Sequence, residues 1–344
     1  MFTPLVRHAS HISKSLTFCG GGKDSLVAMK LLEQLKEPFE VLVYSHSIYG
    51  DKQTQEQIID QLLSHVEAKK LHRIHISDSF SEEAIKPYLE SLGIKTLCAA
   101  ETPSSLFNAL PIALAHSLDH LVLGHEKSAD FNNLIWDVTG EAINHQWGKS
   151  LEAETLLHHY LQEQLIQDLS YFSILKPIRD PVILSYLAQH AEAAPFTHSC
   201  NLKKPWCGKC AKCAYVLLNY CAYLPKEIVK QTFAGNIFDD KDNDPWFSQL
   251  LGLEKQTPFE CVGQPEETKL AFELCKAVGY QGRAMTHYRQ SFGDVGTYEA
   301  WQPLFKVDGQ HHLIPQGLAD SVLPLLQTIA AKGFAFVQES LAEA

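Results

Sequence analysis

The sequence predicts an α/β protein built on a parallel sheet, with a four-cysteine metal knuckle and a smaller C-terminal region. Three observations lead to this prediction: apolar runs alternate with helical patterns, a glycine run follows the first of them, and four cysteines crowd into residues 200–213. Strands that alternate with helices form parallel sheets with right-handed crossovers. We expect a first domain at 1–178, a cysteine segment at 179–235 and a helical region at 236–344.

The elements follow from hydrophobic spacing along the chain. Residues 15–19 predict a strand, the next three residues a glycine turn, and the apolar residues from Leu26 to Leu35 a helix, because they recur at helical spacing. Further strands are expected at 41–45, 71–76, 121–124 and 172–175, and further helices at 55–68, 103–116, 151–168, 214–222, 266–277 and 318–331. The polar segment 233–245 predicts a loop at a domain boundary.

Composition narrows the class of protein. The chain has 344 residues, of which 45% are hydrophobic and 20% charged, as in folded soluble proteins. Its net charge of −11 disfavours binding to nucleic acid and to anionic lipid. No apolar run approaches the ~20 residues of a membrane span, and the first residues lack a signal-peptide pattern. We therefore expect a cytoplasmic protein without a membrane partner, whose nine cysteines stay reduced.

The glycine turn has the features of a phosphate-binding loop. Glycines let the backbone approach an anion closely, and the following helix directs its free N–H groups into the turn. A lysine adds positive charge and a serine adds a hydroxyl group. The candidate residues are Gly20, Gly21, Gly22, Lys23, Asp24 and Ser25. The alternative is an ordinary glycine turn in which Asp24 caps the helix.

The cysteine cluster has the spacing of a metal site. Cys200, Cys207, Cys210 and Cys213 form the pattern C-x6-C-x2-C-x2-C, which places four sulfur ligands close together. Four thiolates suit structural Zn²⁺, and nearby lysines would offset their charge. An iron–sulfur cluster, four free thiols and a redox-active C-x2-C pair are the alternatives.

The glycine turn departs from the Walker sequence and resembles the Ser-Gly-Gly-x-Asp-Ser loop of the ATP pyrophosphatase (PP-loop) superfamily, with Gly20 in place of the first serine. The resemblance implies an adenine nucleotide alpha hydrolase-like domain that splits ATP between its α and β phosphates. It also implies a bound Mg²⁺ ion that bridges the phosphates. By the same resemblance, Tyr44 and Ser45 would lie near the adenine, and Gly124 and His125 would form a second nucleotide-side loop.

Five longer stretches resemble the MurL family, the UDP-N-acetyl-α-D-muramoyl-L-alanyl-L-glutamate epimerases of peptidoglycan precursor synthesis. They are Gly-His-Glu-Lys-Ser-Ala-Asp (124–130), Asn-His-Gln-Trp-Gly-Lys-Ser (144–150), Thr-His-Ser-Cys-Asn (197–201), Lys-Pro-Trp-Cys (204–207) and Thr-Pro-Phe-Glu-Cys-Val-Gly (257–263). The similarity runs from about Leu16 to about Gly279. It implies an ATP-dependent isomerase of cell wall biogenesis and cell shape, whose substrate is a UDP-muramoyl dipeptide.

Epimerisation of a glutamate needs an acid and a base. Adenylation neutralises the carboxylate, so that a general base can remove the α-proton and an acid can return one on the opposite face. Glu126, His145 and Cys261 are catalytic candidates because they are polar residues within these stretches, and Asp24 is a candidate because it follows the glycines of the turn. Each has an ordinary alternative as a surface or core residue.

Three other functions remain open at this level. A phosphate loop with a four-cysteine site is also the plan of 7-cyano-7-deazaguanine synthase, which converts a carboxylate into a nitrile. A tRNA-thiolating enzyme shares the loop and cysteines, although the acidic net charge counts against it. A protein that binds ATP and zinc without catalysis is the third alternative.

Overall fold

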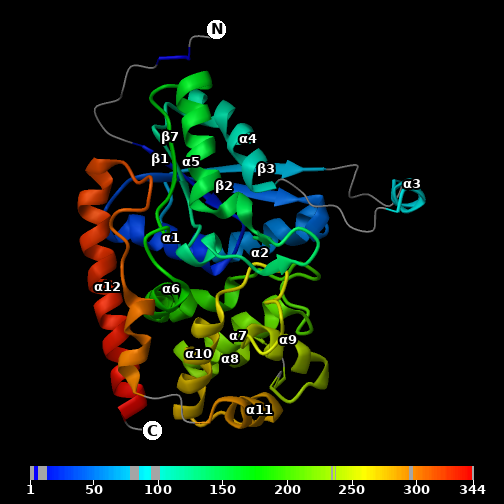
Figure 1. The fold of residues 1–344 in the computed structure, drawn as a ribbon. Helices are drawn as coiled ribbons and strands as arrows, with labels where there is room; N and C mark the ends of the chain where they lie inside the picture. Colours follow the sequence, from blue (N-terminus) through cyan, green and yellow to red (C-terminus); the bar gives the residue numbers. More distant parts are fainter. Residues whose placement is uncertain are drawn as a thin grey trace.

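A computed structural model describes residues 4–6, 14–77, 85–93, 101–233, 235–236, 238–293 and 297–342. Its centre is a five-stranded parallel sheet in the order β3-β2-β1-β4-β7 (Figure 1). The strands are β1 (Ser15–Cys19), β2 (Phe39–His46), β3 (Leu71–Ile76), β4 (His120–Leu123) and β7 (Ser170–Ser173). The predicted α/β class with a parallel sheet is confirmed.

Helices cover both faces of the sheet (Figure 1). One face carries α1 (Lys23–Gln34), α2 (Lys52–Leu63) and α6 (Asp180–Leu187), and the other carries α4 (Glu101–His116) and α5 (Leu151–Tyr160). Strand β2 is continuously apolar because both of its faces are buried. Val41 and Val43 belong to the cluster on the α1 face, whereas Leu42 belongs to the cluster on the α4 face.

The strand order reverses at β1, which pairs with β2 on one side and with β4 on the other. Ligands of open α/β sheets bind at such a switch point, beyond the carboxyl ends of the strands. The glycine turn follows β1 here, and residues 124–126 follow β4. A Cβ atom at Gly124 would lie 2.9 Å from the carbonyl oxygen of Asp24, so glycine lets these two loops touch.

The C-terminal half adds a helical region, most of which lies below the sheet in Figure 1. Its helices are α7 (Ala211–Tyr223), α8 (Lys226–Thr232), α9 (Asp244–Leu250), α10 (Pro265–Ala277), α11 (Arg283–Phe292) and α12 (Gln316–Ala342). Helix α7 is buried along almost its whole length, and α12 packs against α6 and α10. One hydrophobic cluster includes residues from Cys19 to Val337. The division at residues 178 and 235 remains a prediction.

Several helices differ from the sequence-based expectation. The predicted helix 151–168 is shorter, because α5 ends at Tyr160 and a π-helical turn leads toward β7. The helix expected at 318–331 continues to Ala342. Helices α6, α8, α9 and α11 were not predicted. Pro181 and Pro245 lie in the first turns of α6 and α9. Proline is favourable in the first turn of a helix, where its missing N–H costs nothing.

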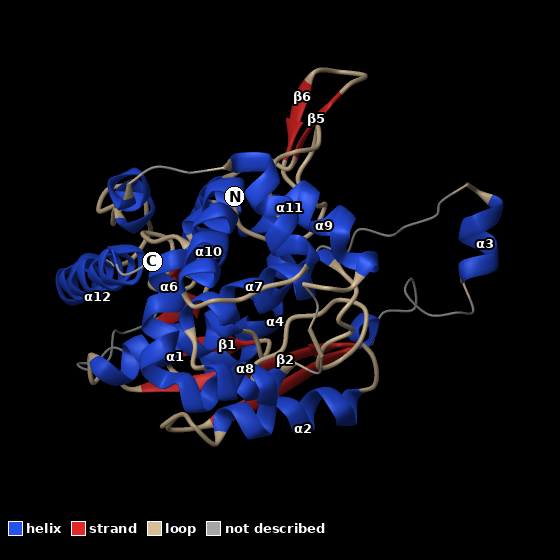
Figure 2. Cartoon of the chain, turned by 90° about the horizontal axis from the view of Figure 1, so that it is seen from below, coloured by secondary structure: helices blue, strands red, loops and turns tan. Residues whose placement is uncertain are grey.

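Two smaller features lie outside the main sheet and the helices that pack on it. A hairpin of β5 (Leu134–Trp136) and β6 (Glu141–Ile143) projects from the body (Figure 2), and its three-residue strands are too short for periodicity to reveal. Helix α3 (Lys86–Ser91) lies in the segment 85–93. Among the described helices, none combines the length and the apolar character that crossing a membrane requires.

Candidate functional site

The glycine turn forms the first wall of the site. Gly22 is the N-cap of α1 and no side chain caps this helix, so the first-turn N–H groups point into the turn. Asp24 lies within the first turn and therefore is not the capping residue considered above. Ser25 Oγ donates a hydrogen bond of 2.9 Å to the carbonyl oxygen of Gly22. The turn has the open N–H groups that an anion needs.

His198 packs directly on Gly21. Its backbone N–H donates a 2.8 Å hydrogen bond to the carbonyl oxygen of Gly21, which has a φ of +86°. A Cβ atom at residue 21 would lie 2.2 Å from His198 Nε2, so both backbone angle and space require glycine. The His198 ring is buried, and neither ring nitrogen has a hydrogen-bond partner among the described residues.

Lys23 is buried beneath the turn between two carboxylates. Its Nζ lies 2.5 Å from an oxygen of Asp24 and 2.5 Å from an oxygen of Asp180. Burial alone would lower the pKa of Lys23, but the charges of Asp180 and Asp24 outweigh it and raise that pKa well above its ordinary value. The second oxygen of Asp180 accepts a 2.7 Å hydrogen bond from the Tyr215 hydroxyl group. Lys23 is therefore charged, and its position is fixed by α6 and α7.

A second wall contains Lys149, Cys261 and Glu126. Lys149 Nζ lies 3.3 Å from Cys261 Sγ. Burial would raise the pKa of Cys261, but Lys149, followed by His145 and Lys212, lowers it to about 6. Burial, with the nearby charges of Asp24 and Asp180, raises the pKa of Glu126 to about 7. The site thus holds a thiol and a carboxyl group that both titrate near neutrality.

Lys149 links these two groups electrostatically. Its own pKa is raised, first by Cys261 and, after the opposing effect of burial, by Glu126. The backbone around it is fixed by the fully buried Lys176, which donates to the carbonyl oxygens of Lys149 (2.8 Å) and Glu126 (3.3 Å). These contacts fix the positions of the loops that carry Glu126 and Lys149 relative to each other.

The loop 257–263 brings Cys261 to this wall. Asn133 Nδ2 donates to the Pro258 carbonyl oxygen at 3.0 Å, and Lys212 Nζ donates to the carbonyl oxygen of Cys261. A Cβ atom at Gly263 would lie 2.1 Å from the Tyr215 hydroxyl oxygen and 2.2 Å from Glu267 Oε2. Glycine at this position therefore lets the loop approach α7 and α10 closely enough to reach the site.

The remaining predicted residues take different positions. The backbone N–H of His145 donates to Asn133 Oδ1 at 2.8 Å, and its ring packs 4.5 Å from Phe259. The pKa of His125 is lowered well below its usual value by burial and by the charges of Lys149 and Lys176, which leaves the ring neutral. In contrast, Tyr44 and Ser45 lie near the end of β2, where their contacts are with Asn108 and His75.

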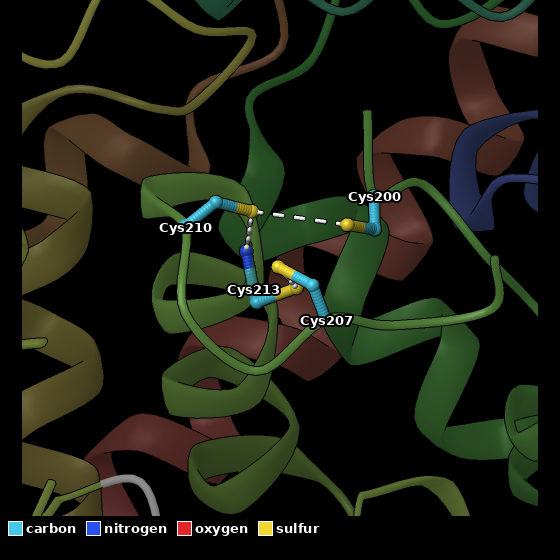
Figure 3. Close-up of side chains that lie close together, drawn as sticks. All are labelled: Cys200, Cys207, Cys210 and Cys213. Carbon is cyan, nitrogen blue, oxygen red and sulfur yellow. Dashed lines mark hydrogen bonds between the residues drawn. The ribbon is translucent and has the colours of Figure 1, made fainter. Parts of the chain in front are cut away.

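The four predicted cysteines lie together beside α7 (Figure 3). All four sulfur atoms lie within 4.8 Å of one another, with 3.9 Å between Cys200 and Cys210 and 3.7 Å between Cys207 and Cys213. A tetrahedral ion with bonds of 2.3 Å requires about 3.8 Å between its sulfur ligands. The donor set and its spacing therefore fit one zinc ion.

Backbone amides surround these sulfur atoms. The N–H groups of Leu202 and Lys203 donate to Cys200 Sγ, that of Lys209 to Cys207 Sγ, and that of Cys213 to Cys210 Sγ, at 3.3 to 3.4 Å. Such donors stabilise thiolates, the form in which cysteine binds metal.

Sequence reasoning did not identify Asp180, Tyr215 or Lys176 as residues of this site. Asp180 and Lys23 are 157 positions apart in the chain, so no local motif connects them. The only signal was the proline after Asp180, which marks the start of a helix.

Comparison with known families finds two domain models. Residues 103–174 match the MurL N-terminal domain, and residues 193–288 match the MurL C-terminal domain. The two ranges include Glu126, His145, Cys261 and all four clustered cysteines. The glycine turn lies outside both ranges.

Curated relatives share the name UDP-N-acetyl-alpha-D-muramoyl-L-alanyl-L-glutamate epimerase. The protein of Micromonospora sp. is 30% identical over 317 residues, which cover 88% of this chain and 66% of the relative. The Salinispora tropica protein is 29% identical over 79% of this chain and 58% of its own length. The Xanthomonas oryzae pv. oryzae protein is 26% identical over 88% and 66%, respectively. The chain thus spans about three fifths to two thirds of these relatives.

A search of solved structures finds the U34-tRNA thiolase NcsA from Methanococcus maripaludis. It is 16% identical, with 65% of this chain and 70% of that chain covered and a TM-score of 0.33.

Proposed function

This chain belongs to the MurL family, and on that premise we propose that it is an ATP-dependent epimerase. Its substrate would be UDP-N-acetylmuramoyl-L-alanyl-L-glutamate, whose terminal L-glutamate it would convert to D-glutamate in peptidoglycan precursor synthesis. One observation carries the proposal: a thiol and a carboxyl group, both with near-neutral pKa values, share a site with a glycine turn that no side chain caps. The compartment we propose is the cytoplasm, where the clustered thiols stay reduced.

The first step proposed is activation of the glutamate α-carboxylate by ATP. The first-turn N–H groups of α1 would bind the phosphates, and the buried Lys23 would add positive charge beneath them. One Asp24 oxygen contacts Lys23, which leaves the other to hold Mg²⁺. Magnesium, when bound, offsets the phosphate charge. The carboxylate oxygen attacks the α-phosphorus of ATP, pyrophosphate leaves, and an acyl-adenylate forms.

The second step is inversion at the α-carbon. Adenylation removes the negative charge of the carboxylate, so a carbanion beside it becomes accessible. We assign proton removal to the Cys261 thiolate, which Lys149 and His145 keep ionised, and proton return to the protonated Glu126 on the opposite face. Water then hydrolyses the acyl-adenylate, which releases AMP and the D-glutamate product.

We assign a structural zinc ion to Cys200, Cys207, Cys210 and Cys213. Four protein ligands leave no open position for substrate, so the ion would stabilise the segment that precedes α7. His198 is two residues from Cys200 and donates to Gly21. The metal segment would therefore support the phosphate-binding turn from one side.

The decisive experiment is turnover of the L-Ala-L-Glu nucleotide in deuterium oxide with ATP and Mg²⁺. We expect D-glutamate with deuterium at Cα, together with AMP and pyrophosphate, and no requirement for ammonium. Cys261→Ser and Glu126→Gln should each lose epimerisation, because each lacks one partner of the proton transfer. An ammonium-dependent product without α-exchange would replace the proposal with a deazaguanine-type reaction. ATP binding without any product would replace it with a binding function.

A further inference from the structure

A second cluster of metal-ligating side chains lies away from the candidate active site. Glu40 is near the start of β2, His72 is near the start of β3, and His116 is the last residue of α4. The sheet is parallel, so these strand positions are at the amino ends, whereas the glycine turn follows the carboxyl end of β1. The two sites are therefore at opposite ends of the strands.

The strand register puts the three side chains on one face. His72 pairs with Leu42, and Glu40 is two residues before Leu42. The side chains of Glu40, Leu42 and His72 therefore point to the same side of the sheet. Leu42 packs in the cluster that α4 covers. His116, at the end of α4, is consequently directed toward Glu40 and His72.

The distances suit a single ion. Glu40 Oε2 lies 2.5 Å from His72 Nε2 and 3.6 Å from His116 Nδ1, and all three donor atoms lie within 4.8 Å of one another. A tetrahedral ion with bonds of about 2.05 Å needs about 3.3 Å between donors. The observed distances bracket this value, so small side-chain rotations would complete the site.

The electrostatic surroundings are mixed. The carboxyl end of α4 and the Glu40 carboxylate both favour a cation. Lys70 opposes it, because its Nζ lies 3.3 Å from His116 Nε2. Its contacts with His116 are at the exposed surface, so the ammonium group is free to turn into solvent when an ion binds.

A simple ion pair between Glu40 and His72 would not need the second imidazole. The two ring centroids are 4.5 Å apart at an interplanar angle of 70°, and the same oxygen of Glu40 lies near a nitrogen atom of each ring. His72 is 10% exposed, Glu40 18% and His116 27%, so solvent and an ion can reach all three side chains.

We propose that Glu40, His72 and His116 form a second metal site, which takes a divalent first-row ion with a preference for nitrogen and oxygen, such as Zn²⁺. The ion would join β2, the edge strand β3 and α4. Its effect would be to stabilise this edge of the sheet, and it does not depend on the proposed epimerase reaction.

The test uses the full chain, already loaded with one zinc ion, and titrates it with further Zn²⁺ by calorimetry. We expect one additional ion per chain and a rise in the melting temperature. His116→Gln should weaken this binding by at least about tenfold. Loss of a residue that only supports a ligand already costs about tenfold in metal affinity, and loss of a ligand itself costs more. Lys70→Ala should strengthen it, because the opposing charge is gone.

His287→Gln is the matched control, since this histidine lies on α11 and contacts Ser248. It should bind the additional ion as the unaltered chain does. The proposal fails if no additional ion binds, or if His116→Gln and the unaltered chain bind it equally. ATP turnover is recorded separately, so the zinc titration can be interpreted even if the epimerase proposal fails.

Discussion

Replacement of Lys149 by Met tests how the site ionises Cys261. Lys149 is the strongest of the groups that lower the pKa of this thiol to about 6. At pH 7 a pKa of about 6 leaves about 90% thiolate, whereas the ordinary value of 9.0 leaves about 1%. Burial favours the neutral thiol once the charge is removed. Because His145 and Lys212 still lower this pKa, we expect Lys149→Met to reduce the thiolate fraction, and epimerisation at pH 7, by about tenfold to a hundredfold.

The measurement is the thiolate absorbance near 240 nm as a function of pH. The chain has other cysteines, so each titration is recorded against the same protein with Cys261→Ser, and the difference isolates Cys261. The sign is fixed by the lowered pKa: thiolate is present above about pH 6 and is lost as the pH falls through that value. In Lys149→Met the acid limb of the activity profile should move toward higher pH.

Lys127→Met is the control, because Lys127 lies in the same region but pairs with Asp308 at 2.6 Å. It should leave the Cys261 titration unchanged. An unchanged Cys261 titration in Lys149→Met would show that the charge 3.3 Å from the sulfur does not set its ionisation. The assignment of Cys261 as the base would then lose its physical reason.

Three further predictions concern the turn, the metal and the loop. Asp24→Ala should abolish release of AMP and pyrophosphate while the circular dichroism spectrum is retained; unchanged release would remove Asp24 from the mechanism. Cys207→Ser should eliminate binding of the zinc ion proposed at the cysteine cluster and lower the melting temperature, because structural zinc contributes roughly 10–16 kcal/mol of apparent binding energy in small peptides; zinc at one equivalent in this variant would contradict the assignment. Gly263→Ala should destabilise the chain by about 1–3 kcal/mol in urea unfolding, since its Cβ would overlap the Tyr215 hydroxyl group; Gly309→Ala, whose nearest contact is 3.9 Å away, is the control and should change little.

The sheet and the cysteine cluster could be predicted because their signals are local. The strand at 15–19, the helix after the glycines and the C-x2-C spacing are each complete within about twenty residues. Helix α6 was missed because Asp180 and Pro181 have the composition of a turn. Here the favourable position of proline at the first helical turn, together with a fully buried face, outweighed the local composition.

The charges of the site could not be predicted in the same way. A glutamate after β4 carries no sign that its pKa is near 7, because that value depends on burial and on Asp24 and Asp180, which lie in other segments. The same holds for Cys261, whose ionisation depends on Lys149, 112 positions earlier in the chain. Motif reading selected both residues as candidates, and only the fold gives a physical reason for their chemistry.

The fold also explains why a C-terminal helical region accompanies the parallel sheet. Asp180 contacts Lys23 with one oxygen and Tyr215 with the other, and Tyr215 is in turn packed against Gly263, the last residue of the loop that carries Cys261. A continuous set of buried contacts therefore joins the glycine turn to this loop. In the proposed mechanism, the sheet contributes the residues that activate the carboxylate, and the C-terminal region contributes the thiolate that removes the proton. Because the same contacts position both, the acyl-adenylate would form where the base is already in place.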